Sequence, residues 1–299
     1  MTGASRDAPR WDVEGRAWPN RQCSRLVETP GMRWHVQAAG QGPVLLLLHG
    51  TGAATHTWRA MLPLLAQHHT VIAPDLPGHG FTRGRPKLGL TLAGMAGALA
   101  DLMERMDAQP ALVVGHSAGA AIALQLVHAQ GSYAPVIGFN PALMPFPGLA
   151  ARLFPSLAKI LFVNPLVPRM LAGIARIPGE TGRFLARATG SRIDAEGIAA
   201  YEALMTSPRH CGGAMEMMAS WDLESLSRLL PRIAVPVLLV HSTSDRAIPL
   251  GSVEQAARAI PDCRLEVLPG LGHLAHEEAP ETAARLIGSF ARETLGEPA

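Results

Sequence analysis

The sequence predicts an α/β fold: a mostly parallel, doubly wound sheet with helices on both faces and a helical cap inserted after the sixth strand. Continuous apolar runs such as "PVLLLL" at residues 43–48 are typical of strands buried on both faces of a parallel sheet. These runs alternate with segments of helical periodicity, as in βαβ units. The alternation stops at residue 141 and resumes at about residue 231. So long an interruption, rich in Pro, Met, Phe and Leu, predicts a separate helical unit.

The first 140 residues supply the six strands that precede the cap. Residues 23–40 predict a hairpin, because Pro30 and Gly31 form a turn signal between two strand-like runs. Apolar runs of strand length and segments with an amphipathic helical pattern then follow one another. In order, the expected elements are strands at 43–48, 70–74, 111–115 and 135–140, and helices at 57–68, at 91–107 and from 118.

The last part of the chain returns to the same alternation. It predicts a strand at 235–242, a helix from 252, a strand at 264–268 and a final helix from about 281. The expected organisation is therefore an irregular N-terminal arm at 1–22, a core at 23–140 and 231–299, and a helical cap at 141–230.

Composition favours a globular protein without a nucleic-acid partner. Hydrophobic residues make up 48% and charged residues 17% of the 299 positions, so the chain can bury a large core. The net charge is only +2, and the 26 Lys and Arg residues form no basic cluster. The mean hydropathy of +0.16 is high. It favours an unusually apolar pocket, or a surface in contact with a membrane or an apolar partner.

The sequence shows no targeting, membrane-spanning or metal-binding signal. The N-terminus lacks the apolar centre of a secretory signal, and the longest apolar stretches are strand-sized or interrupted by proline. The three cysteines lie far apart with neither zinc nor redox spacing, so we expect buried free thiols. A cytoplasmic protein with no metal and no cofactor is the expectation.

A serine between two glycines marks the expected nucleophile. In "LVVGHSAGA", the predicted strand runs directly through Gly115, Ser117 and Gly119 into a helix. A G-x-S-x-G turn in this context is a nucleophile elbow, where small residues relieve crowding around a strained serine. The helix N-terminus behind Ser117 favours developing negative charge. Taken alone, the pentapeptide is equally compatible with an ordinary β–α turn.

Three further loops supply the expected partners of this serine. In "LLLLHGTGAATHTW", the Thr51 amide is expected to form an oxyanion hole together with the Ala118 amide. His273 in "LPGLGHLAHEEAP" is the expected general base, whereas His276 lies where the chain turns into a helix and is interpreted as structural. Asp245, in the loop after the preceding strand, is expected to orient the imidazole.

Three other positions compete with Asp245 for the acid's place. Asp222 lies where the cap ends, and Asp75 lies in the "DLPGHG" loop. Asn140 also follows a strand, but its amide cannot serve as the acid. Asp245 is preferred because the resulting order of nucleophile, acid and base is the one expected for this architecture. The three groups then meet at the carboxyl edge of the sheet.

Together these segments resemble the α/β-hydrolase-fold superfamily, from about Met32 to the C-terminus. The resemblance rests on the segments HGTG, DLPGHG, GHSAG, SDRAIP and GHLAHEEAP. It implies an enzyme that hydrolyses its substrate with a Ser-His-Asp triad. The sequence departs from the usual pattern at Ala120, where glycine is usual, and at Phe81 and Thr82, where a serine often follows Gly-His-Gly.

A narrower set of segments is similar to a family of bacteriochlorophyll-biosynthesis hydrolases labelled magnesium-chelatase accessory proteins. The segments lie in both the core and the cap, and include "HGTGAATHTWR", "PALMPFPGLAARLF" and "MMASWDL". This resemblance implies a phototrophic bacterium and a role in tetrapyrrole metabolism. It also implies an apolar, tetrapyrrole-like substrate and magnesium chelatase subunits as partners.

The first part of the cap is expected to cover the serine with an apolar pocket. It is rich in Met, Phe and Leu, which together suit a flat apolar ligand, although for any single one of these side chains packing of the cap onto the core is the preferred interpretation. The same stretch is compatible with peripheral membrane contact through Lys159 and Arg169, although prolines interrupt it. The candidate pocket residues are His116, Met144, Phe146, Phe154 and Leu157.

Three functions remain open at this point. The leading one is hydrolysis of an ester or similar acyl bond by Ser117, His273 and Asp245. An alternative is a non-catalytic porphyrin-binding accessory protein of magnesium chelatase. A cofactor-free haloperoxidase or perhydrolase would use the same three groups. Dehalogenase and epoxide-hydrolase chemistry is disfavoured because it needs an aspartate at position 117.

Overall fold

A computed structural model describes residues 7–132, 134–145, 164 and 166–296. Nine strands of these residues form one sheet in the order β1-β2-β4-β3-β6-β7-β8-β9, with β5 paired to β2. β2 is antiparallel to β1, β4 and β5, and the remaining neighbours from β4 to β9 are parallel. The chain therefore has the mostly parallel sheet that the sequence predicts.

The bounds of the elements follow the predicted alternation. The strands are β1 (Ser24–Thr29), β2 (Met32–Ala39), β3 (Val44–Leu48), β4 (Thr70–Pro74), β5 (Arg83–Gly84), β6 (Pro110–His116), β7 (Val136–Phe139), β8 (Val237–Ser242) and β9 (Cys263–Leu268). The α-helices are α1 (Met61–Leu65), α2 (Leu92–Arg105), α3 (Ala118–Gln130), α5 (Leu166–Ala175), α6 (Glu180–Thr189), α7 (Ala195–Met205), α8 (Pro208–Ala219), α9 (Leu223–Leu229), α10 (Leu250–Ala259), α11 (Ala275–Glu278) and α12 (Pro280–Leu295). The 3-10 helices are η1 (Glu14–Ala17), η2 (Arg21–Cys23), η3 (Thr55–Trp58) and η4 (Leu230–Arg232).

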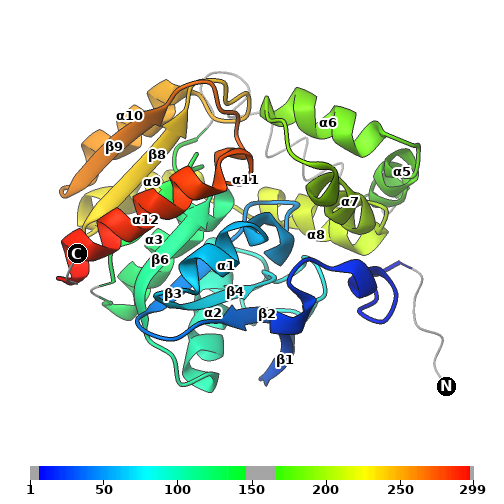
Figure 1. Cartoon of the computed structure of the whole chain (residues 1–299), viewed down its shortest axis with the longest axis horizontal. Coiled ribbons are helices and arrows are strands. Elements are labelled where there is room, and N and C mark those ends of the chain that lie inside the picture. Colours follow the sequence, from blue (N-terminus) through cyan, green and yellow to red (C-terminus); the bar gives the residue numbers. More distant parts are fainter. Residues whose placement is uncertain (1–6, 133, 146–163, 165, 297–299) are drawn as a thin grey trace.

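The leucine run of β3 explains why the sheet has a hydrophobic core on each face. Leu46 and Leu48 pack in a cluster with α2, α3 and α10, whereas Leu45 and Leu47 pack with α1 and α12. Because successive strand residues point to opposite faces, an uninterrupted apolar run requires helices on both sides. Figure 1 shows α1 and α12 crossing one face of the sheet and α2, α3 and α10 on the other side.

Helices α5 to α8 lie between β7 and β8 in the chain and form a group beside the sheet; we call this group the cap (Figure 1). The cap packs closely on the core: a Cβ on Gly213 of α8 would lie 2.0 Å from the Gly78 carbonyl oxygen. Helices α5 to α8 contact one another, whereas the main helix contact of α9 is with η4. Leu226 of α9 and Leu230 of η4 belong to the hydrophobic core, as does Met217 of α8. We therefore propose that the cap ends before α9, and not at residue 230.

Several local predictions need correction. The expected helix at 57–68 is split into η3 and the short α1, and the two-residue strand β5 has no recognisable sequence signal. The thiols are free, but only Cys211 is buried, while Cys23 and Cys263 are half-buried. None of the described helices is long and apolar enough to cross a membrane.

Candidate active site

The serine elbow has the strained geometry that its sequence predicts. Ser117 has φ 51° and ψ −113°, a conformation that costs a non-glycine residue about 1–3 kcal/mol. Both bracketing glycines are required: a Cβ on Gly115 would lie 2.3 Å from the Ala120 nitrogen, and one on Gly119 would lie 2.0 Å from the Leu48 carbonyl oxygen. The turn therefore holds Ser117 between β6 and α3, with its side chain half-exposed.

The expected acid and base meet. Asp245 Oδ2 lies 2.8 Å from His273 Nδ1, and Asp245 Oδ1 accepts hydrogen bonds from the amides of Ala247 and Ile248 at 2.7 and 3.0 Å. The Asp245 side chain is fully buried, and 9% of the His273 side chain is exposed. A carboxylate on Nδ1 places the ring proton there, so Nε2 retains the lone pair that a general base needs.

The elbow contacts the base-bearing loop through the residue before Ser117. The His116 Nε2–H donates to the His273 carbonyl at 2.9 Å, and the two imidazole centroids are 4.7 Å apart. Burial, with the nearby His276 and His273, holds the pKa of His116 well below its usual value, so this donor is neutral. No described residue forms a hydrogen bond with the Ser117 hydroxyl. Catalytic hydrogen bonds in ligand-free enzymes often tighten only when substrate binds.

Asn140 supports the same loop, a role that its sequence context does not predict. Its Nδ2 lies 2.7 Å from the His273 carbonyl, 3.1 Å from the Gly272 carbonyl and 3.2 Å from Ser242 Oγ. An aspartate here would bring carboxylate oxygens against these carbonyls. An amide donor is therefore the residue type that suits a position facing backbone acceptors.

The loop expected to form the oxyanion hole lies against the serine. A Cβ on Gly50 would lie 3.2 Å from Ser117 Cβ, so the loop after β3 reaches the elbow. The described residues include no acceptor for the amides of Thr51 or Ala118, and an oxyanion donor must be free in this way. His210 of α8 fixes Gly52, the residue after Thr51, because the His210 Nε2–H donates to the Gly52 carbonyl at 3.0 Å.

His210 ties the cap to two core loops at once. Besides its bond to Gly52, it accepts the Gly80 amide at Nδ1 with a distance of 3.1 Å. Both ring nitrogens are thus satisfied by the neutral form. Burial lowers the pKa of His210 to about 4, against the smaller opposing effect of the Gly52 bond.

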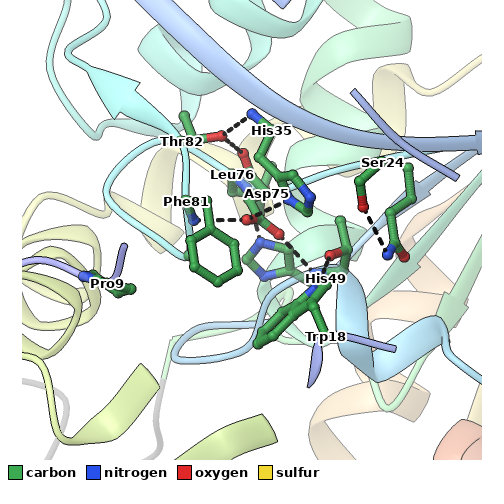
Figure 2. Close-up of polar contacts among 12 residues, drawn as sticks. Pro9, Trp18, Ser24, His35, His49, Asp75, Leu76, Phe81 and Thr82 are labelled. Atoms are coloured by element: carbon green, nitrogen blue, oxygen red, sulfur yellow. Dashed lines mark hydrogen bonds and ion pairs between the residues drawn. The ribbon is translucent and has the colours of Figure 1, made fainter. Parts of the chain in front are cut away.

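Asp75 is a structural centre, not the acid of the site (Figure 2). Its Oδ2 accepts a hydrogen bond from the Phe81 amide at 2.8 Å and lies 2.8 Å from His35 Nδ1. Its Oδ1 accepts a hydrogen bond from the Thr55 amide at 2.8 Å. Burial would raise the pKa of Asp75, but His35 and these donors hold it below its usual range. The Thr82 hydroxyl donates to the Asp75 carbonyl at 2.7 Å. The carboxylate therefore joins the loops after β3 and β4.

A buried network surrounds Glu277, two residues beyond the start of α11. The Thr57 and Tyr201 hydroxyls donate to Glu277 Oε1 at 2.6 and 2.8 Å, and Arg59 pairs with Oε2. Thr57 also accepts from His276 Nε2 at 2.7 Å. His276 is fully buried, which agrees with its interpretation as structural. The network joins η3, the cap helix α7 and α11, the helix that follows the base-bearing loop.

The expected pocket is only partly within the described residues. Met144 is half-buried and packs against the hydrophobic core. His116 is 2% exposed and its Nε2 supports the His273 loop, and its place in the pocket stays a prediction. Phe146, Phe154, Leu157 and Lys159 lie outside the described residues. Within the described part of the chain, no group of three or more His, Cys, Asp or Glu side chains could hold a metal ion.

Sheet order, elbow and acid–base pair together define a class of protein. The chain belongs to the Alpha/beta hydrolase family, whose profile matches residues 45–286. Most members of this family are hydrolases. The fold alone is also shared with a thermophilic esterase from Thermogutta terrifontis, at a TM-score of 0.70 and 24% identity, covering 91% of this chain and 98% of that one.

Two relatives are similar over most of their length. The chain is 43% identical to the "Magnesium-chelatase 30 kDa subunit" of Rhodobacter capsulatus over 277 residues, which covers 90% of this chain and 95% of that protein. It is 32% identical to the "Pimeloyl-[acyl-carrier protein] methyl ester esterase" of Aromatoleum aromaticum over 261 residues, covering 84% and 98%.

Proposed function

We propose that this chain is a serine hydrolase that cleaves an ester or similar acyl bond. Ser117 attacks the carbonyl carbon, and His273 takes the hydroxyl proton and returns it to the leaving group. Asp245 keeps the His273 proton on Nδ1 and stabilises the imidazolium that forms. The Thr51 and Ala118 amides donate to the developing oxyanion.

One observation carries the proposal: a buried carboxylate holds the His273 imidazole in the base tautomer, and the loop that carries His273 is hydrogen-bonded to the residue before a serine on a strained turn. The 2.8 Å contact between Asp245 and His273 is a specific arrangement. The positive φ of Ser117 is energetically costly for a residue other than glycine. Strained backbone at a polar, half-exposed serine indicates a functional position more than a packing requirement. The ester bond named in the Aromatoleum relative supports the same reaction class.

We propose further that the substrate is an apolar tetrapyrrole ester or related acyl compound, and that the enzyme acts beside the magnesium-chelation step of bacteriochlorophyll synthesis in the cytoplasm. The support is the printed name of the Rhodobacter relative together with the high hydropathy of the chain. Physical contact with magnesium chelatase subunits is part of this proposal.

A second candidate function is favoured by the same name. A protein called a chelatase subunit could present a porphyrin to the metal-inserting complex without cleaving any bond. Both functions need the fold and the cap, but only hydrolysis needs the hydroxyl of Ser117.

The two functions are separated in cells. In a phototrophic bacterium that lacks its own copy of the gene, the wild-type chain is expected to restore bacteriochlorophyll, and Ser117→Ala is expected to leave tetrapyrrole intermediates accumulated. Pigment extraction with chromatography measures both. Ser227→Ala, at a half-buried serine of α9 whose hydroxyl donates only to the Glu224 carbonyl, serves as the matched control and should restore pigment fully. Full restoration by Ser117→Ala at normal protein levels would favour the binding function instead.

A further inference from the structure

The cap holds the base-bearing loop directly. The His273 amide donates to the Thr189 carbonyl at 2.9 Å, and the Leu274 amide donates to Ser191 Oγ at 2.8 Å. Thr189 is the last residue of α6, and Ser191 follows two residues later. Because the His273 carbonyl is held by core side chains, the two sides of this residue are fixed by two different parts of the fold.

The same cap turn also contacts the acid-bearing loop. The Arg246 amide points to the Thr189 carbonyl at 3.4 Å. A Cβ on Gly190 would lie 2.2 Å from the Ser244 carbonyl oxygen, so the turn packs against the residue before Asp245. Gly190 has φ 73°, which glycine adopts readily. One short segment, residues 189–191, therefore contacts both loops of the acid–base pair.

The turn at residues 189–191 is buried and held by its own hydrogen bonds. Thr189 and Ser191 are both buried, and Thr189 Oγ1 donates to the Leu185 carbonyl at 2.6 Å while accepting the Ser191 amide at 3.1 Å. The base-bearing loop leaves space for Ser191 because it has a glycine at this point: a Cβ on Gly272 would lie 2.4 Å from Ser191 Oγ. The hydroxyl thus sits in a fixed position against the backbone it supports.

A side-chain link reinforces the contact next to the turn. Glu278 accepts the Gly272 amide at 2.8 Å through one carboxylate oxygen and the Arg192 amide at 3.1 Å through the other. One carboxylate therefore bridges the cap and the base-bearing loop. The cap and the loop form a continuous hydrogen-bonded unit.

We propose that Ser191 and the Thr189 carbonyl are positioning groups, which align His273 with Asp245 only while the cap is docked. The inference rests on the proposed function for its catalytic meaning. These contacts hold the backbone of the base-bearing loop from the cap side, so that the orientation of the His273 ring depends on the cap turn as well as on the core.

Ser191→Ala tests this with hydrolysis of p-nitrophenyl butyrate. Losing one hydrogen bond to the loop is expected to lower kcat about tenfold and to change KM by less than about twofold.

Thr181→Val is the matched control. Thr181 lies in the first turn of the same helix α6, is buried, and has a hydroxyl without a partner among the described residues. Replacing it with a side chain of the same shape should leave kcat and KM unchanged. An unaltered kcat in Ser191→Ala, or an equal loss in Thr181→Val, would overturn the inference.

A measurement that needs no turnover separates this inference from the proposed function. The Nδ1 proton of His273, which lies on the 2.8 Å contact with Asp245, is expected to give a downfield NMR resonance that is assigned by its loss in His273→Gln. In Ser191→Ala it is expected to exchange with water about tenfold faster than in the wild type or in Thr181→Val. If the wild type cleaves no ester, the proposed function fails, and this exchange rate still decides the positioning role. An unchanged rate would overturn it.

Discussion

Ser117→Ala is expected to lower kcat for ester hydrolysis on the order of a million-fold, which is the effect of removing the nucleophile from a serine triad. The remaining groups cannot form an acyl-enzyme, so only oxyanion stabilisation and substrate binding are left. Turnover of p-nitrophenyl butyrate measures the loss, with Ser227→Ala as the control for an ordinary serine substitution.

The same variant should fold as well as the wild type. The Ser117 hydroxyl forms no hydrogen bond with the described residues, so its removal leaves no buried group without a partner. Urea unfolding should therefore give a free energy within about 0.5 kcal/mol of the wild-type value. A variant that retains most of its turnover, while folded, would show that another group attacks the substrate.

Glu277→Leu is expected to destabilise the fold by about 3–5 kcal/mol, because it leaves the buried Arg59 without its main counter-charge. The Thr57 and Tyr201 hydroxyls lose their acceptor in the same step. Burial raises the pKa of Glu277 while Arg59 opposes the rise, as expected for a carboxylate kept in the interior by its partners. The midpoint of urea unfolding, followed by circular dichroism, measures the effect.

Two further variants separate the buried pair from ordinary charge effects. Arg59→Met combined with Glu277→Leu should recover part of the lost stability, since no unpaired charge then remains buried. Glu254→Gln removes an exposed partner of Arg258 and should change the unfolding free energy by less than about 0.5 kcal/mol. A loss below about 1 kcal/mol in Glu277→Leu would contradict the role assigned to the network.

The elements and residues that the sequence predicts correctly share one property: their signal is local. The leucine run of β3 specifies a doubly buried strand within five residues. The two glycines around Ser117 specify the strained turn of the nucleophile elbow within a segment of five residues. The loops carrying Asp245 and His273 are found because each follows a strand, and the alternation of elements fixes where those strands end.

What the sequence does not reveal depends on pairs far apart in the chain. His35 and Asp75 are separated by 40 positions, and Thr57 and Glu277 by 220, so no periodicity connects them. A buried carboxylate in a loop after a strand is compatible with a catalytic or a structural role until its donors are known. The sequence predicts that α9 belongs to the cap, because α9 is helical and follows other helices, whereas the proposal that the cap ends before α9 depends on tertiary packing.

Covalent labelling of Ser117 tests the central claim most directly. A fluorophosphonate probe reacts with a serine that an aligned imidazole has activated, and peptide mass spectrometry locates the adduct. We expect one adduct, on the peptide that contains Ser117, in the folded protein, with labelling at least about a hundredfold slower in His273→Gln. Labelling should be absent after unfolding in urea. No adduct on Ser117 in the folded protein, or equal labelling in His273→Gln, would contradict the account.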